Sequence, residues 1–257
     1  MRKIRLSFQK NIRDLGGLTG HNGLKVKNRR IYRGGFLGHV NEEDIKIIDD
    51  LGLTDIIDFR GTHEFKNRPD YRFKGVTFHN FPSMKEDVKK EESKSEDSNL
   101  LWFLGDNTNG FKHMYDLYPE LLVSKEGISA LRKFFELLLS KPDGVFYFHC
   151  SQGKDRAGLA AYLLESALGV SPEDAREDYL LSNEAMKIRT RYHIEELCGK
   201  DFYNETYEKA LYDVFSAKEE YLNHALEVVE SKYGSIEIYL IKELRVDIPK
   251  LRELYLE

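Results

Sequence analysis

Cysteine is scarce in this sequence of 257 residues, which contains only Cys150 and Cys198. So few cysteines exclude a disulfide framework of the kind that stabilises small secreted domains, and a chain of this length can bury a sizeable core without one. Long apolar runs are missing as well, and the basic N-terminus lacks the continuous apolar segment of a signal peptide. We therefore expect a cytoplasmic protein with no stable membrane insertion, although a leaderless secretion route would leave no N-terminal trace.

Positive charge is not in surplus either. The 39 Lys and Arg residues are outnumbered by 44 Asp and Glu residues, which gives a formal net charge of −5. This balance speaks against a general nucleic-acid binder, so any anion site must be local. The histidines other than His149 are scattered without the spacing of metal ligands. We expect neither a metal nor another cofactor.

Two segments in the first third of the chain predict a helix followed by a strand. The sequence NEEDIKIIDDLG at 41–52 has Asn41 as a candidate N-cap, an acidic residue at the capping-box offset and a closing glycine. The residues that follow, LTDIIDFRG, predict a buried strand whose carboxyl end delivers Asp58 and Arg60 into a loop. A second short strand is expected at 76–81, before a proline.

The rest of the chain is richer in helical patterns. An apolar stripe at helical spacing runs through 120–140, and the unbroken apolar run VFYFHC at 145–150 is typical of a central strand covered on both faces. A helix ending at Gly169 follows, and Ser171 is the N-cap of another. Together these patterns predict an α/β fold, with a mostly parallel central sheet flanked by helices and a helix-rich C-terminal half, in a single domain over 1–257.

A polar insert is expected at about 84–110. From 84 to 99 nearly every residue is charged or polar, with no apolar face at the helix or the strand period, which predicts a solvated loop. A lid helix over the active site is the alternative. The run LLWFLG at 100–105 could dock the insert on the core or contact an apolar substrate.

The sequence CSQGKDR, from Cys150 to Arg156, joins the predicted central strand to a helix. In such a loop successive backbone N–H groups can turn inward around an anion, and the N-terminus of the helix adds its positive end. A phosphate ion fits that cup. Substrate binding is therefore assigned to the loop residues Ser151, Gln152, Gly153 and Lys154.

The same positive field favours the thiolate form of Cys150, which makes this residue the candidate nucleophile. Arg156 has a planar fork that can bind two phosphate oxygens and the charge of the transition state. A cysteine six positions before an arginine is common by chance, but the preceding strand, His149 and the loop glycine make the pattern specific. The alternative is an inert core cysteine beside a surface arginine.

The resemblance of this chain to a known family extends beyond the loop. The sequence resembles the bacterial tyrosine phosphatases, including mycobacterial members and related enzymes that act on both phosphoproteins and phosphoinositides. The motifs that carry the resemblance are NIRDLGG at 11–17, YRGG at 32–35, DFRGTHEF at 58–65, HCSQGKDRAG at 149–158, DYLLSN at 178–183 and YGSIEIYL at 233–240.

The resemblance implies a single α/β phosphatase domain, no metal, and hydrolysis through a cysteinyl-phosphate intermediate. Similar family members place a lysine and an aspartate in the loop, matched here by Lys154 and Asp155. Myotubularin-type lipid phosphatases also carry an aspartate next to the loop arginine, which makes phosphoinositides credible additional substrates. Because Asp155 lies beside Arg156, we expect Asp155 to be the general acid.

Other candidate residues keep two interpretations each. Asp58 is either a general acid or a support that holds Arg13 or Arg156. Arg13 either binds substrate at the pocket rim or forms a surface ion pair with a neighbour such as Asp14. His149 is expected to support the loop rather than to carry a proton, and Cys198 is expected to be an ordinary half-buried cysteine.

The sequence thus favours a phosphatase whose partner is a phosphorylated protein or a phosphoinositide. A rhodanese-like sulfurtransferase also uses a cysteine in a strand-to-helix anion loop, but it normally lacks this loop sequence. A phosphate-binding adaptor is the non-enzymatic alternative. Such adaptors usually replace the cysteine or the arginine, whereas Cys150 and Arg156 are both present here.

Overall fold

The computed structural model describes residues 3–85, 109–197 and 204–257. Most of the expected insert at about 84–110 lies outside these ranges, as do the run at 100–105 and Cys198. Whether the insert is a lid therefore stays a prediction.

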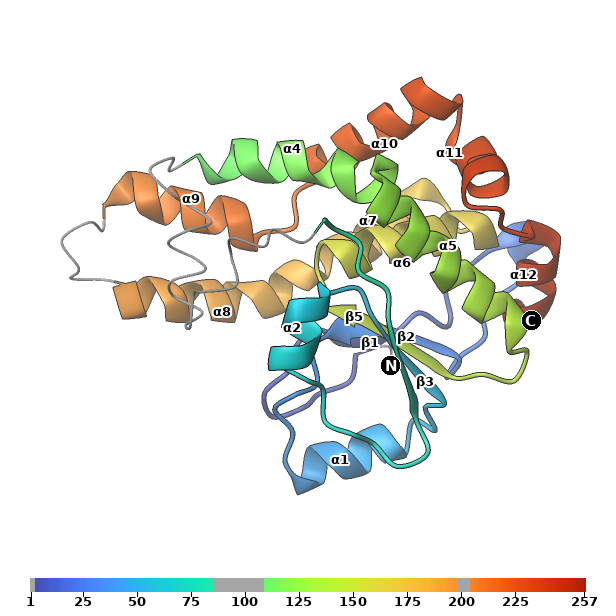
Figure 1. Ribbon diagram of the computed structural model, residues 1–257, viewed down its shortest axis with the longest axis horizontal. Helices are drawn as coiled ribbons and strands as arrows, with labels where there is room; N and C mark the ends of the chain where they lie inside the picture. Colours follow the sequence, from blue (N-terminus) through green and yellow to red (C-terminus); the bar gives the residue numbers. More distant parts are fainter. Residues whose placement is uncertain (1–2, 86–108, 198–203) are drawn as a thin grey trace.

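The described residues build a five-stranded sheet with the order β1-β2-β5-β3-β4. Neighbouring strands run parallel, except that β1 is antiparallel to β2. The predicted mostly parallel sheet is confirmed, and the apolar run VFYFHC forms its central strand (Figure 1). The strands are β1 (Ile12–Asp14), β2 (Ile31–Gly35), β3 (Asp55–Asp58), β4 (Thr77–Asn80) and β5 (Phe146–Cys150).

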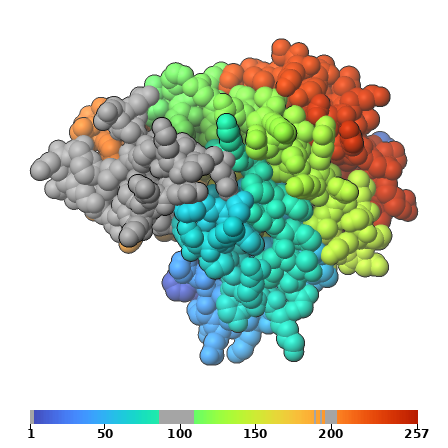
Figure 2. All heavy atoms as spheres, viewed as in Figure 1, coloured from blue at the N-terminus to red at the C-terminus, as the bar shows by residue number. Residues whose placement is uncertain are grey.

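Helices cover the sheet on both faces. The helices are α1 (Glu42–Asp49), α2 (Thr62–Asn67), α4 (Gly110–Val123), α5 (Lys125–Ser140), α6 (Arg156–Leu168), α7 (Pro172–Leu180), α8 (Ser182–Leu197), α9 (Glu205–Phe215), α10 (Glu219–Tyr233), α11 (Ile236–Ile238) and α12 (Ile248–Tyr255). Helix α1 lies on one face, whereas α4, α5, α6, α10 and α12 gather on the other (Figure 1). In the space-filling view the N-terminal part, blue to teal, forms a lower block with the green and red helices packed above it (Figure 2).

The central strand explains why both faces need cover. Phe146 and Phe148 join the large core under the helices that follow β5, whereas Tyr147 joins the smaller core under α1. Alternate side chains of a strand point to opposite faces, so an unbroken apolar run is stable only when both faces are dry.

Local capping signals position three of these helices as expected. Asn41 caps α1 with a reciprocal capping box to Asp44, Gly169 ends α6 with a φ of 78°, and the Ser171 side chain caps α7. The stripe over 120–140 differs from expectation, since it belongs to two helices. Ser124 is extended, with its hydroxyl capping the second helix through the Gly127 N–H, and so it separates α4 from α5.

Helices α8 and α9 extend to one side of the sheet together with the start of α4 (Figure 1). Ile194 of α8 packs on a small apolar cluster of α9. Gly110 allows α4 to approach α9 closely, because a Cβ at this position would lie 2.3 Å from the Ala210 carbonyl oxygen. Across the described ranges, no helix combines the length and the apolar character needed to cross a bilayer.

Candidate active site

The loop from Cys150 to Arg156 lies where the sheet predicts a ligand site, at the carboxyl end of the central strand. Cys150 ends β5 and is 2 % exposed, and α6 begins at Arg156. Gly153 has a φ of 71°, and a Cβ added to it would lie 2.2 Å from the Gly34 carbonyl carbon. This position therefore requires glycine for both its conformation and its close approach to β2.

Side chains from two neighbouring strands hold the outer surface of the loop. Asn11 Nδ2, just before β1, donates to the Gln152 carbonyl at 2.9 Å, and Arg33 Nη2 of β2 donates to the Gly153 carbonyl at 3.1 Å. In a trans peptide the C=O and the next N–H point in opposite directions. The N–H groups of Gly153 and Lys154 therefore point away from these donors, as an anion-binding loop requires.

Beneath the loop lies a buried ionic cluster. Asp178 of α7 accepts from Arg13 Nε at 3.1 Å and from Arg13 Nη2 at 3.0 Å, and its Oδ2 also accepts from Arg33 Nη1 at 2.8 Å. Burial, reinforced by the neighbouring Arg13 charge, lowers the pKa of Arg33 to about 10. Arg33 still carries its charge at neutral pH.

This cluster changes the interpretation of Arg13. The side chain is buried, whereas a surface ion pair was one expectation, and its partner is Asp178 rather than Asp14. Asp14 instead accepts from the backbone N–H groups of Gly16 and Arg29. Substrate binding by Arg13 stays a prediction.

Arg156 is anchored to α2 by a carboxylate that the sequence analysis did not single out. Glu64 accepts from Arg156 Nη1 at 3.1 Å and from the Ser151 hydroxyl at 2.7 Å. Although burial opposes the charge, the Arg156 guanidinium and the Ser151 hydroxyl lower the pKa of Glu64 to about 2. Despite its own burial, Arg156 has a raised pKa because Glu64 and Cys150 lie close to it. Glu64 thus fixes the arginine beside the cysteine.

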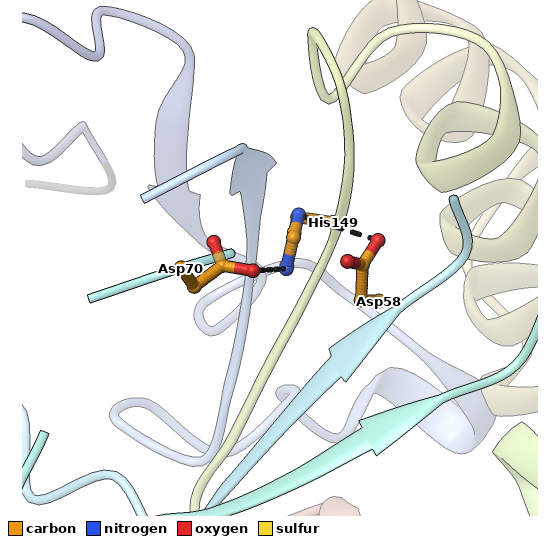
Figure 3. A group of neighbouring side chains, drawn as sticks. All are labelled: Asp58, Asp70 and His149. Atoms are coloured by element: carbon orange, nitrogen blue, oxygen red, sulfur yellow. Dashed lines mark ion pairs between the residues drawn. The ribbon is translucent and has the colours of Figure 1, made fainter. Parts of the chain in front are cut away.

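His149 lies between two buried carboxylates, Asp58 and Asp70 (Figure 3). Its Nδ1 donates to the Cys150 carbonyl at 3.1 Å and is 3.9 Å from Asp58 Oδ1, and its Nε2 is 3.3 Å from Asp70 Oδ2. Burial disfavours the imidazolium, but the charges of Asp70 and Asp58 outweigh burial and raise the pKa of His149 to about 9. His149 is therefore a cation that braces the backbone of the nucleophile.

Asp58 holds Arg60, and not Arg13 or Arg156 as the sequence suggested. Arg60 Nη2 donates to Asp58 Oδ2 at 2.7 Å and to Asp70 Oδ2 at 3.0 Å. The ligand-type atoms of Asp58, Asp70 and His149 lie within 4.8 Å of one another, a spacing that a metal could use. Because the Arg60 guanidinium bridges both carboxylates, the group is better described as an ion network than as a metal site.

Lys154 and Asp155 face the helices rather than the sheet. Lys154 is 1 % exposed, and its Nζ donates to the Val214 carbonyl at 2.7 Å and the Ser216 carbonyl at 3.2 Å. The same Nζ lies 2.9 Å from Asp155 Oδ1, an oxygen that also accepts from the Tyr118 hydroxyl at 2.6 Å. Asp155 therefore lies beside Arg156 with one oxygen occupied, and Lys154 is engaged by the end of α9.

Comparison with known proteins agrees with this geometry. A model of the tyrosine phosphatase family matches residues 4–257. The chain belongs to this family. This confirms the resemblance inferred from the sequence motifs.

Two relatives of this phosphatase align over most of its length. A Cupriavidus necator protein assigned by name to the tyrosine-protein phosphatases is 28% identical over 261 residues, which cover 96% of this chain and 85% of the relative. The triple specificity protein phosphatase PtpB of Mycobacterium tuberculosis is 27% identical over 236 residues, which cover 82% of this chain and 84% of PtpB.

The residues of this phosphatase that the sequence analysis missed share one property. Glu64, Arg33, Asp178 and Tyr118 act through partners that are distant in the chain. The first three lie inside motifs that carry the family resemblance, but no local rule gave their roles, and Tyr118 lies outside those motifs. One signal was present for Arg33, because an arginine directly after the apolar residues Ile31 and Tyr32 needs a counter-charge if this segment is buried.

Proposed function

We propose that this chain hydrolyses phosphate monoesters, phosphotyrosine first among them, through a cysteinyl-phosphate intermediate. The observation that carries the proposal is the loop at the end of β5, where Cys150 and Arg156 lie together and Glu64 anchors the arginine. Inward N–H groups and a fixed guanidinium suit a dianion with three equatorial oxygens.

The proposed reaction has two displacements. In the first, the Cys150 thiolate attacks phosphorus, the ester P–O bond breaks, and the leaving oxygen takes a proton from Asp155. In the second, water attacks the cysteinyl phosphate, Asp155 takes back a proton, and the S–P bond breaks to release inorganic phosphate and the thiolate. Arg156 binds the phosphoryl oxygens throughout.

The hydrogen bonds of the two candidate acids favour Asp155 over Asp58. Both oxygens of Asp58 accept from Arg60, at distances of 2.7–3.0 Å, and the residue is buried behind His149. Asp155 has one oxygen that accepts no bond from the described residues, and its side chain is partly exposed at the loop.

Phosphoinositides are proposed as additional substrates, because the loop resembles that of lipid phosphatases with an aspartate beside the arginine. The name of one relative gives it triple specificity, which supports more than one substrate class. Lys154, which the sequence assigned to substrate binding, could contact an additional phosphate of an inositol ring only by leaving the Val214 and Ser216 carbonyls. A Lys154→Met variant separates the roles. A larger loss on polyphosphorylated inositides than on phosphotyrosine supports contact, by roughly 1.5–3 kcal/mol for one charge-assisted bond. Equal losses assign Lys154 to loop shape.

The direct test of the phosphatase proposal is a substrate panel with the purified protein and two cysteine variants. Wild type should hydrolyse phosphotyrosine peptides in the presence of a chelator, and Cys150→Ser should bind them without turnover. Cys198→Ser, the matched control, should hydrolyse them as wild type does. Near-normal hydrolysis by Cys150→Ser would refute the nucleophile assignment.

The same panel separates the rival functions. Turnover of thiosulfate without phosphate release would indicate a sulfurtransferase. Binding of phosphopeptides by wild type without any turnover would indicate an adaptor.

A further inference from the structure

The Tyr118 hydroxyl, on α4, donates to Asp155 Oδ1 at 2.6 Å. Tyr118 is fully buried, whereas Asp155 lies partly exposed at the catalytic loop. A phenol that reaches a loop carboxylate from the core joins the helix layer directly to the proposed general acid.

Asp155 gives up a local interaction to make this bond. The residue occupies the N-cap position of α6, where an aspartate side chain usually accepts from the N–H groups of the first helical turn. Here Asp155 makes no such capping bond. A broken local preference of this kind is expected at functional sites, where a tertiary partner has displaced the local one.

The two oxygens of Asp155 are not equivalent. Oδ1 accepts from Tyr118 and lies 2.9 Å from Lys154 Nζ, whereas Oδ2 makes no hydrogen bond to any residue that the structure describes. The hydrogen bond and the ion pair on this one oxygen fix the rotation of the carboxyl group. Oδ2 is then the oxygen left to carry and deliver a proton.

Tyr118 is itself held in place by a second buried phenol. Its hydroxyl lies 2.7 Å from that of Tyr179 on α7, which lies 3.3 Å from the Lys218 carbonyl at the start of α10. Burial, with the Asp155 charge, raises the pKa of both phenols well above the usual value. The chain of hydroxyls therefore stays protonated whenever the enzyme works.

We propose that Tyr118 is a positioning residue for the general acid. It holds Oδ1 of Asp155 so that Oδ2 faces the ester oxygen of the substrate. As the ester P–O bond breaks, its electron pair stays on the leaving oxygen, which takes the proton from Oδ2, while Tyr118 keeps its own. This inference rests on the proposed phosphatase function.

The test is a double-mutant cycle read against the leaving group. Wild type, Tyr118→Phe, Asp155→Asn and the double variant are compared on phenyl phosphate, whose leaving group needs a proton, and on 4-nitrophenyl phosphate, whose leaving group does not. Asp155→Asn should lose on the order of 10²–10⁴ in kcat/KM on phenyl phosphate only, because kcat/KM reports the first displacement and not the later step in which Asp155 takes back a proton. Tyr118→Phe should lose roughly tenfold there, the worth of one hydrogen bond to a charged group. The double variant should be no slower than Asp155→Asn.

Tyr255→Phe is the matched control, because Tyr255 is also fully buried and donates to a core carbonyl, that of Leu138, at 2.8 Å. It should leave the ratio of the two rates unchanged. Equal losses by Tyr118→Phe on both substrates, or a further loss in the double variant, would overturn the positioning role.

The other outcomes distinguish a wrong general acid from a wrong proposed function. If Asp155→Asn shows no dependence on the leaving group, the acid assignment and the role of Tyr118 both fail while the phosphatase function stands. If wild type hydrolyses neither ester, the proposed function fails as well.

Discussion

Two regions of the molecule support the loop from Cys150 to Arg156 in different ways. Charged side chains support it from beneath, whereas a chain of two neutral hydroxyls reaches Asp155 from the helix layer. The ionic support consists of Arg13, Arg33 and Asp178, together with the Glu64–Arg156 pair at the rim. The hydroxyl chain consists of Tyr118 and Tyr179, ending near the Lys218 carbonyl.

The two supports suit different tasks. A buried charge loses its hydration, so Arg13, Arg33 and Asp178 depend on one another, and removing one leaves another unpaired. Glu64 at the rim is partly exposed and keeps part of its hydration. A phenol with a raised pKa keeps its proton across the working range, so the hydroxyl chain can orient an acid without titrating itself. The loop geometry therefore rests on charge pairing, and the orientation of the acid rests on the neutral Tyr118 hydroxyl together with the Lys154 ammonium.

The largest effect is expected when Asp178, the carboxylate shared by Arg13 and Arg33, is removed. Asp178→Ala leaves Arg13 and Arg33 buried without their counter-charge, so the free energy of unfolding should fall by about 3–5 kcal/mol. Urea denaturation measures this. Asp116→Ala is the matched control, because it removes an exposed helix pair with Lys112 and should cost only about 0.2–1 kcal/mol. Similar losses in the two variants would contradict a buried, interdependent cluster.

The next largest effect is expected on catalysis, when Arg156 at the rim of the loop is replaced. Arg156→Lys keeps the charge but loses the fork that meets Glu64 and, in the proposed mechanism, the phosphate. We expect kcat on a phosphotyrosine peptide to fall by roughly 10²–10³. A loss confined to KM would show that Arg156 binds substrate and transition state equally.

His149 lies in a separate ion network with Asp58 and Asp70, and it should give the stability of the protein a pH dependence. Because its pKa is raised to about 9, its stabilising contribution is fully present below its ordinary value of about 6.5 and is lost as the pH rises through 9. His149→Asn keeps a donor for the Cys150 carbonyl without the charge. The stability gap between wild type and this variant should shrink by up to roughly 3 kcal/mol between pH 6 and 10. A gap that is constant with pH would show that His149 is neutral.

The smallest effect is expected at Glu64. Its pKa is lowered to about 2, so its contribution is complete above about 4.5 and is lost only as the pH falls toward 2. Glu64→Gln should therefore lower kcat by roughly tenfold and by the same factor at every pH between 5 and 8. A factor that changes across that range would mean that Glu64 titrates during catalysis.

The two supports also differ in how much of them could be predicted. Cys150, Gly153 and Arg156 lie within one strand-to-helix connection, where local rules of turn, nest and helix start apply, and the α/β fold followed from similar periodic signals. The partners of these residues come from other elements. Glu64 meets Arg156 across 92 positions and Arg33 meets Asp178 across 145, and no spacing rule connects such residues.

Asp58 is a residue whose position could be predicted from the sequence but whose partner could not. Its place at the end of a strand was predicted correctly, but which arginine it holds depended on a turn of two residues that brings Arg60 back onto it. Tyr118 lies just before the helical stripe that the sequence predicted over 120–140, and nothing local marked it, because its hydroxyl partner lies on another element.

The central claim, a cysteine-dependent mechanism, is tested most directly by trapping the covalent intermediate. Wild type is mixed with a phosphotyrosine peptide carrying radioactive phosphate and quenched in acid at times shorter than one turnover. Label should appear on the proteolytic fragment that contains Cys150, rise and then decay as phosphate is released, and be absent from Cys150→Ser. Complete turnover with no label on that fragment at any time, or equal labelling of Cys150→Ser, would contradict the mechanism.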